Sequence, residues 1–221
     1  MFVLFQMPKN DTFGNMEQKI QQLDTPAQQA TFVAFDPFSA IVIKKIAEAK
    51  DINAKIALFE SIMNDERVDV INIEVKARTV LYPNNRGRKT KHWEQTKQMA
   101  YDLNKNGIDV VFLPEYDSDT SADSVIRIGK MCRIADFKYA STTNSNTLAT
   151  ELKHGFEQAN TIVLKLDQMD GGQFRDCIDY LNRNGIKTGD ILLINKYGKN
   201  KYLFYSELRN NKYQKLIKGF L

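Results

Sequence analysis

Cysteine and histidine are scarce in this chain, whose 221 residues include only two of each. The two cysteines, Cys132 and Cys177, lie far apart and form no metal-spaced pair, so we expect free thiols in a reducing compartment. The two histidines, His92 and His154, are too few for a histidine-rich zinc site. The composition therefore argues against a disulfide-rich domain and against a zinc centre of that kind.

Long hydrophobic runs are also missing. No stretch approaches the roughly 20 apolar residues that a membrane-spanning helix requires. The apolar start at residues 1–5 is too short for the core of a signal peptide and has no basic flank. With 43% hydrophobic and 26% charged residues, the chain has the composition of an ordinary globular protein. We therefore expect a soluble protein of one large or two small domains, with no export signal of its own.

No single charge sign dominates the sequence. Its 31 Lys and Arg and 27 Asp and Glu give a net charge of +4, which is compatible with a polyanionic partner but is weak evidence for one. The densest basic cluster lies in residues 81–92, a loop interrupted by proline, asparagine and glycine, and its members are Arg86, Arg88, Lys89 and Lys91. This cluster either grips phosphates or is a solvated connector, and both interpretations stay open.

The hydrophobic periodicity alternates between helical and strand spacing along the chain. After a loosely ordered start, helices are predicted at residues 38–50, 53–63, 93–106, 147–159 and 172–184. Strands are predicted at residues 31–35, 68–80, 108–113, 122–127, 134–139, 161–166, 190–195 and 202–206. The pattern predicts an α/β fold in which helices flank a mixed central sheet. We divide the chain into an N-terminal α/β region of unknown role, residues 1–80, and a second domain, residues 81–221.

The strand predicted at 134–139 carries Asp136-Phe137-Lys138. Successive side chains of a strand point to opposite faces, so Asp136 and Lys138 share one face, and the other face is shared by Ala135, Phe137 and Tyr139. A hairpin through Gly129-Lys130 could bring Asp123, at the start of the preceding strand, towards Asp136. Two carboxylates and one ammonium group are the set that holds a divalent metal and activates a water.

Three observations weaken the interpretation of these residues as a metal site. Polar residues that alternate along a strand usually mark a solvated face. A second acid-x-lysine, Glu74-Val75-Lys76, lies in the predicted strand 68–80, although no separate acid-bearing strand precedes it. Glu94, in the first turn of helix 93–106, is better explained on its own by its favourable position at the positive end of the helix dipole.

From residue 93 to residue 166 the predicted order is helix, strand, strand, strand, helix, strand. With an acid before the second strand and acid-x-lysine in the third, this order resembles the PD-(D/E)XK nuclease superfamily. The chain is most similar to the C-terminal nuclease domains of contact-dependent growth inhibition toxins, which share the helix with a glutamate and the strand end Val-Val-Phe-Leu-Pro-Glu at residues 110–115. The likeness covers about residues 93–195 and implies a restriction-endonuclease-like core.

The resemblance also implies roles for individual residues. Asp123 matches the first acid of the family motif, Asp136 the second, Lys138 the lysine and Glu94 the helix glutamate. The three acids would bind a divalent metal, most plausibly magnesium, with manganese or zinc as alternatives, and Glu115 is a reserve ligand. Lys138 would orient or deprotonate the attacking water. The chain departs from the family at Ala122, where the motif has proline, and in having Asp where the third strand more often has Glu.

The implied substrate is DNA or tRNA. Lys153 and the basic cluster of residues 86–91 would contact its phosphate backbone. A toxin-type nuclease of this kind would act in the cytoplasm, after delivery as part of a larger secreted toxin, and would have an immunity protein as partner. Two alternatives stay open. One is a non-catalytic nucleic-acid-binding protein that retains the nuclease fold, and the other is a metal-independent ribonuclease that relies on His92 or His154.

Overall fold

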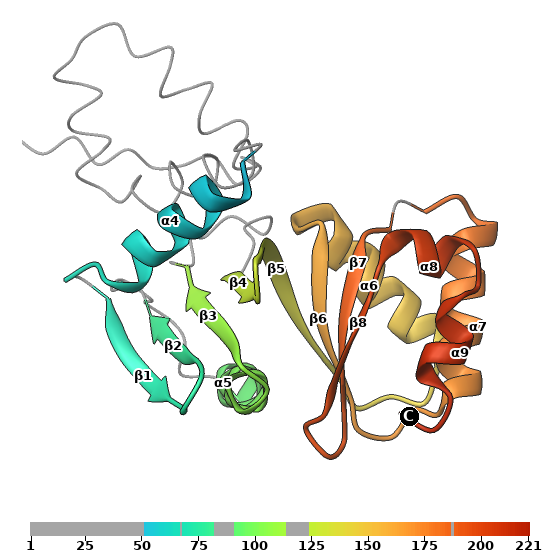
Figure 1. Cartoon of the computed structure of the whole chain (residues 1–221). Helices are drawn as coiled ribbons and strands as arrows, with labels where there is room; N and C mark the ends of the chain where they lie inside the picture. Colours follow the sequence, from blue (N-terminus) through green and yellow to red (C-terminus); the bar gives the residue numbers. More distant parts are fainter. Residues whose placement is uncertain (1–50, 67, 82–90, 114–123, 187) are drawn as a thin grey trace, which may run out of the picture.

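The structure is a computed structural model that describes residues 51–66, 68–81, 91–113, 124–186 and 188–221. These residues form one eight-stranded sheet in which the strands lie side by side in sequence order (Figure 1). The strands are β1 (Asp69–Ile73), β2 (Arg78–Leu81), β3 (Ile108–Phe112), β4 (Ser124–Ile128), β5 (Met131–Ala140), β6 (Thr161–Leu166), β7 (Asp190–Asn195) and β8 (Asn200–Leu203). The helices are α4 (Ile52–Met63), α5 (Lys91–Lys105), α6 (Ser145–Gln158), α7 (Gly171–Arg183), α8 (Tyr205–Arg209) and α9 (Tyr213–Ile217).

The sheet is mixed. Strands β2 and β3 are parallel, as are β5, β6 and β7, whereas the other neighbouring pairs are antiparallel. Helices connect the parallel strands, as such crossovers require. The predicted α/β class, with helices flanking a mixed central sheet, is confirmed. The order of elements from α5 to β6 is also the predicted one.

Helices cover both faces of the sheet. Helix α5 packs on one face, where Met99 and Leu103 join a core with Val110, Phe137 and Val163. On the opposite face α4 covers the β2–β5 half, whereas α6 and α7 cover the β5–β7 half (Figure 1). None of the helices that the structure describes is long and apolar enough to cross a membrane.

Local chemistry explains where α6 and α7 begin. The side chain of Asn144 accepts hydrogen bonds from the backbone N–H groups of Asn146 and Thr147, so it caps the N-terminus of α6. Asp170 and Gln173 form a reciprocal capping box at the start of α7. Both helices then bury an apolar stripe against the sheet, which holds them in place.

Two predicted strands are wrong in part. Residues 68–80 form a hairpin rather than one strand, because the backbone N–H of Glu74 donates to Ala77 O at 2.8 Å and closes a turn between β1 and β2. Glu74, Val75 and Lys76 lie in this turn, so the rival acid-x-lysine is not on a strand. Residues 205–209 form α8 instead of extending a strand, because Glu207 accepts a hydrogen bond from Phe204 N at 2.8 Å and caps the helix.

The N-terminal boundary of the fold can be described only from residue 51 onwards. The strand predicted at 31–35 and the helix predicted at 38–50 lie outside the described residues. Strands β1 and β2 lie almost entirely within the predicted N-terminal region, residues 1–80. They belong to the same sheet as β3–β8. The sheet therefore runs through the junction that we placed between the two predicted regions.

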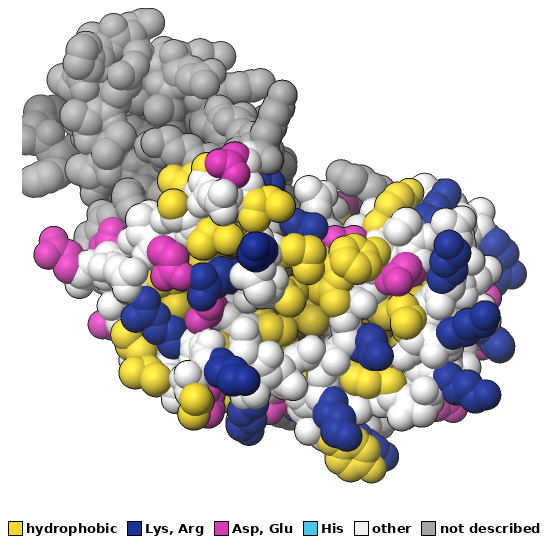
Figure 2. All heavy atoms as spheres, viewed as in Figure 1, with side chains coloured by type: hydrophobic (Ala, Val, Ile, Leu, Met, Phe, Trp, Pro, Cys, Tyr) yellow, Lys and Arg dark blue, Asp and Glu magenta, His cyan; other side chains and the backbone are white. Residues whose placement is uncertain are grey.

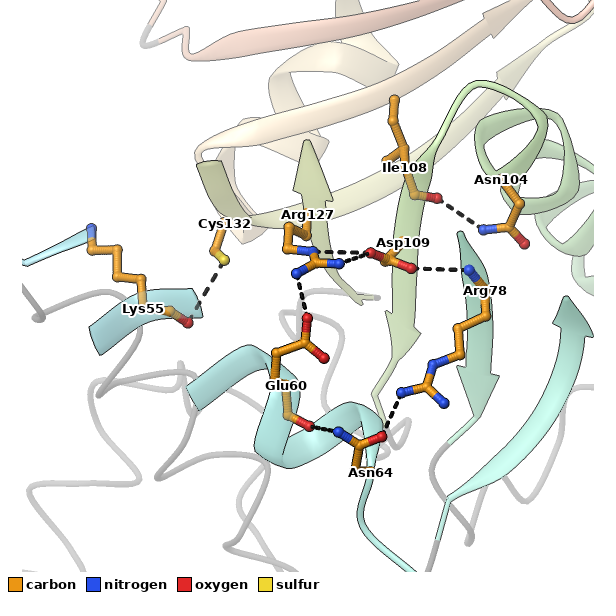
Figure 3. A network of polar contacts seen from close by, with 9 residues as sticks. All are labelled: Lys55, Glu60, Asn64, Arg78, Asn104, Ile108, Asp109, Arg127 and Cys132. Atoms are coloured by element: carbon orange, nitrogen blue, oxygen red, sulfur yellow. Dashed lines mark hydrogen bonds and ion pairs between the residues drawn. The ribbon is translucent and has the colours of Figure 1, made fainter. Parts of the chain in front are cut away.

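A polar network fixes α4 to the sheet (Figure 3). The Asp109 side chain, only 7% exposed on β3, accepts hydrogen bonds from Arg127 Nε at 2.9 Å and Arg127 Nη2 at 2.6 Å, and from the backbone N–H of Arg78 at 2.9 Å. Arg127 also pairs with Glu60 of α4. Because a buried carboxylate is costly without a counter-charge, Arg127 stabilises both Asp109 and the position of α4.

We expect Arg127→Met to destabilise the fold by about 2–3 kcal/mol, somewhat less than the loss of one partner from a fully buried pair. The substitution keeps the aliphatic stem but leaves Asp109 buried without its cation. Urea unfolding measures the change. In the matched control, Glu60→Gln, the loss should stay below ~1 kcal/mol because that carboxylate is 41% exposed. Equal losses in the two variants would contradict the assigned role of Asp109.

Candidate functional site

The central strand β5 presents the candidate residues to the α6 side of the sheet. Asp136 pairs in register with Ile162 and Lys138 with Leu164, and both of these apolar residues belong to the core under α6 and α7. Phe137 points to the opposite face, into the core under α5. The predicted division of side chains between the two faces is confirmed.

Asp136 and Lys138 form an ion pair, with Lys138 Nζ 2.8 Å from Asp136 Oδ2. The Asp136 side chain is only 2% exposed, whereas that of Lys138 is 25% exposed. The interpretation of these residues as a solvated strand face is therefore wrong for Asp136. A carboxylate in such a place needs a cation, and Lys138 supplies one that also reaches the surface.

A glycine in α6 lets the helix backbone lie directly over this pair. A Cβ atom built on Gly155 would be 2.8 Å from Asp136 Oδ2, 3.2 Å from Lys138 Cε and 2.5 Å from Ile162 Cδ1. Real Cβ atoms almost never come so close to another atom. Only glycine therefore allows α6 to cover the carboxylate at this distance.

Glu151 is a third ionisable group near the pair, and the sequence analysis missed it. It lies one helical turn before Gly155, so the two residues share a face of α6. Burial raises the pKa of Glu151 above its usual 4.5, and the Lys138 ammonium partly opposes this. Burial also raises the pKa of Cys177 to about 12, with the Glu151 charge contributing. A mid-helix glycine four residues after a glutamate was the available signal in the sequence.

The hairpin of β4 and β5 places Ser124, the first residue of β4, opposite Ala135. The Ser124 Oγ donates to Ala135 O at 3.1 Å. Ser124 is the sequence neighbour of Asp123, and Ala135 is that of Asp136. The other candidates that lie outside the described residues, along with Asp123, are Arg86, Arg88, Lys89, Glu115 and Ala122.

Glu94 is not brought next to Asp136 and Lys138. It is in the first turn of α5, on the other face of the sheet, where its 71% exposed side chain pairs with Lys97 at 2.7 Å. Its neighbour Trp93 packs on Phe112 with ring centroids 5.0 Å apart. The N-terminus of α5 therefore lies near the end of β3.

Three further candidates are exposed on helices. Lys153 and His154 are exposed on α6, and His92 is exposed near the start of α5. Lys91 is the first residue of α5. Each histidine therefore belongs to a different face of the sheet, and the structure does not combine them into one site.

The donor chemistry is consistent with a hard divalent cation but the described residues do not complete a site. Among residues 51–66, 68–81, 91–113, 124–186 and 188–221, no three His, Cys, Asp or Glu side chains gather closely enough to hold a metal. Magnesium, however, keeps several waters and is often held by only one or two carboxylates together with substrate phosphates. Asp136 would be one such ligand if its Oδ2 binds the metal while remaining next to the Lys138 ammonium group.

We expect Gly155→Ala to destabilise the protein by about 1–3 kcal/mol, because the new methyl group collides with Ile162 and Asp136 and pushes α6 away from β5. Thermal or urea unfolding measures the loss. The matched control is Gly171→Ala in α7, where a Cβ would make an ordinary 3.8 Å contact with Ile217 and should stabilise slightly. A neutral or stabilising Gly155→Ala would contradict the close helix–strand contact.

The raised pKa of Glu151 predicts a specific pH dependence. Because the folded state binds this proton more tightly than the unfolded state does, stability falls as the pH rises from 4.5 through the raised pKa of Glu151. Glu151→Gln should remove that part of the decline, as measured by urea unfolding between pH 4.5 and 8. Glu157→Gln, an exposed change on the same helix, should keep the wild-type profile. Identical profiles for both variants would exclude the effect.

Comparison with known proteins gives little further information. No protein-family model and no curated protein sequence matches the chain. Among solved structures, the chain is similar to a CdiA-CT/CdiI toxin and immunity complex from Burkholderia pseudomallei, with 24% sequence identity and a TM-score of 0.40 over 55% of this chain and 91% of that chain. Both values are low, so this similarity assigns neither a family nor an activity.

Proposed function

We propose that the protein is a metal-dependent endonuclease that hydrolyses phosphodiester bonds in DNA or tRNA, with Asp136 and Lys138 at its centre. The observation that carries the proposal is the nature of this ion pair. It joins two residues of one strand, and its carboxylate is almost fully buried while its lysine reaches the surface. The pair of similar length and burial on the other side of the sheet, Asp102 with Lys165, joins α5 to β6. The Asp136–Lys138 pair instead places an acid and a lysine together on the α6 side of β5, the combination that a metal-dependent nuclease site requires.

The order of elements around the pair supports the same proposal. Helix α5, strands β3, β4 and β5, helix α6 and strand β6 follow one another as in the nuclease superfamily that the sequence resembles. Asp136 and Lys138 occupy the third of these strands. Asp123 immediately precedes the second strand, whose first residue, Ser124, pairs with Ala135.

In the proposed site, Asp136 and Asp123 hold the divalent metal, most plausibly magnesium. When bound, the metal supplies an acidified water and positive charge for the scissile phosphate. Lys138, the partly exposed member of the pair, would orient that water through its N–H groups and offset the phosphate charge. Glu151 positions the Lys138 ammonium from the α6 side. Glu94 stays a predicted ligand that rests on the resemblance alone.

The biological setting follows from the resemblance in the sequence. A toxin-type nuclease would reach the cytoplasm of a target cell as part of a larger secreted toxin, and the producing cell would need an immunity protein. The basic residues of the 86–91 cluster and Lys153 are the proposed contacts to the nucleic-acid backbone, and such contacts weaken as salt is added.

A second function is favoured by one specific observation. Asp136 is covered by α6, and its Oδ2 is already paired with Lys138. If Lys138 does not share this oxygen with a metal, the pair is structural. The chain would then be a nucleic-acid-binding protein that retains the nuclease fold without turnover.

We expect purified protein to cut plasmid DNA or total tRNA when magnesium or manganese is present and to stop when a chelator is added. Asp136→Asn and Lys138→Met should each lower the rate by at least about 100-fold, the range for a lost acid–base or metal-binding group. The matched control is Asp102→Asn, which disrupts the ion pair with Lys165 and should leave cleavage intact if the protein remains folded by circular dichroism.

The outcomes separate the candidate functions. Cleavage that survives Asp136→Asn would contradict the proposed site. If that cleavage also survives a chelator and disappears in His92→Ala or His154→Ala, a metal-independent ribonuclease is indicated. Binding of nucleic acid without cleavage under any metal would support the non-catalytic function.

A further inference from the structure

A cavity of about 580 Å³ opens at the carboxyl ends of β6 and β7. Residues 166–170, which follow β6, form one wall, and residues 195–199, which form the β7–β8 turn, form another. The C-terminal residues 218–221 close the third side. In α/β sheets, the carboxyl ends of parallel strands are where ligands usually bind. This volume also lies within the usual range for ligand pockets.

The cavity is lined by four lysines, which are Lys196, Lys199, Lys201 and Lys218. They belong to a basic segment of the chain, because residues 196–221 contain seven Lys and Arg but one acid, Glu207. Figure 2 shows Lys and Arg side chains gathered over these C-terminal elements, on the right and lower sides of the molecule. Such a local excess of positive charge attracts polyanions even though the net charge of the chain is only +4.

Described acidic residues do not neutralise these lysines. The cavity wall contains two acidic side chains, of which Asp167 accepts a hydrogen bond from the Tyr139 hydroxyl and Asp170 caps α7 through Gln173 N at 2.9 Å. In the part of the chain that the structure describes, none of the four lysines lies within 4.0 Å of a carboxylate oxygen. Their charges are therefore available to an anionic ligand.

The turn that carries the lysines is held by one buried amide. Asn195, 5% exposed, accepts hydrogen bonds from Tyr197 N at 3.0 Å and Lys199 N at 3.1 Å, and its Nδ2 donates to Phe220 O at 2.8 Å. Gly198 adopts a φ of +73°, the left-handed region that favours glycine. Because these contacts fix the turn and tie it to the C-terminal residues, the cavity is formed before a ligand arrives.

An aromatic ring stands at the rim of the cavity. Tyr197 is 75% exposed, and Lys196 Nζ lies 5.1 Å from its ring centroid. An exposed large aromatic residue beside unpaired lysines is the combination that binds single-stranded nucleic acid, because bases stack on the ring while the ammonium groups contact the phosphates. A cavity for a simple inorganic anion would need no such ring.

We propose that this cavity binds the sugar–phosphate backbone of single-stranded nucleic acid, with a base on Tyr197 and phosphates on the four lysines. The choice of nucleic acid as ligand rests on the proposed function, although the site itself is separate from Asp136. One wall residue, Leu166, pairs in register with Ala140, which is two residues beyond Lys138 on β5. The cavity would thus hold a part of the substrate away from the bond to be cut.

The test measures binding of a fluorescently labelled 12-nucleotide single strand by anisotropy in EDTA, so that cleavage does not interfere. The test variant is Lys199→Gln/Lys218→Gln. Its matched control, Lys76→Gln/Lys130→Gln, removes the same charge from exposed lysines in the β1–β2 and β4–β5 turns. We expect Kd to rise at least about tenfold in the test variant only, and the slope of log K against log[salt] to become shallower by about 1.4, or ~0.7 for each lost contact. Tyr197→Ala should weaken binding without changing the slope.

Three results would overturn the inference. Equal losses in the test and control variants would mean a general charge effect, and unchanged binding in the test variant would mean that the cavity is not used. If inorganic phosphate displaces the oligonucleotide when both supply the same concentration of phosphate groups, the cavity is a simple anion site. The binding assay contains no metal, so its result does not depend on cleavage. If the folded protein binds through these lysines but never cuts nucleic acid, the proposed nuclease function is wrong and the proposed binding cavity is still supported.

Discussion

The burial of Asp136 is the constraint on which the arrangement around β5 depends. An ionised carboxylate that is nearly removed from water is tolerable only when a cation and hydrogen-bond donors compensate for its lost hydration. Lys138 provides the cation from the same strand face, and Gly155 provides the space in which α6 can cover both groups. The strand spacing, the lysine and the helix glycine therefore form one unit, and a change in any of them alters the other two.

Ion pairs elsewhere in the fold have a different role. Arg127 connects Asp109 on β3 with Glu60 on α4, and Lys165 on β6 connects with Asp102 on α5. These contacts hold a helix against each face of the sheet, which accounts for the cost of burying their charges. The Asp136–Lys138 ion pair, by contrast, joins two residues of one strand, β5.

The residues that the strand contributes to this site could be predicted from the sequence, whereas those that helix α6 contributes could not. Asp136 and Lys138 were placed on one face because a strand has a fixed period of two, and that rule needs no tertiary information. Gly155 and Glu151 were missed because the distance between α6 and β5 is set by packing, which local periodicity does not contain.

The errors in predicted strands have equally local causes. Val75 preserved the apolar alternation of residues 71–77 although it lies in a turn and is 98% exposed. The apolar and aromatic residues 202–205 favour a strand, but the Glu207 side chain caps a helix there. The four-lysine cavity was not predicted because residues after β6, the β7–β8 turn and the C-terminal residues meet only in the folded chain.

Binding of manganese to the metal-free protein, followed by electron paramagnetic resonance, tests the central claim most directly, because it requires no knowledge of the substrate. If Asp136 is a metal ligand, wild type and Asp102→Asn should bind Mn²⁺ alike, whereas Asp136→Asn should bind it at least about tenfold more weakly, the usual effect of altering a metal site. Equal affinity of all three folded proteins for Mn²⁺, or no binding by any of them, would contradict the account and leave Asp136 and Lys138 as a structural pair.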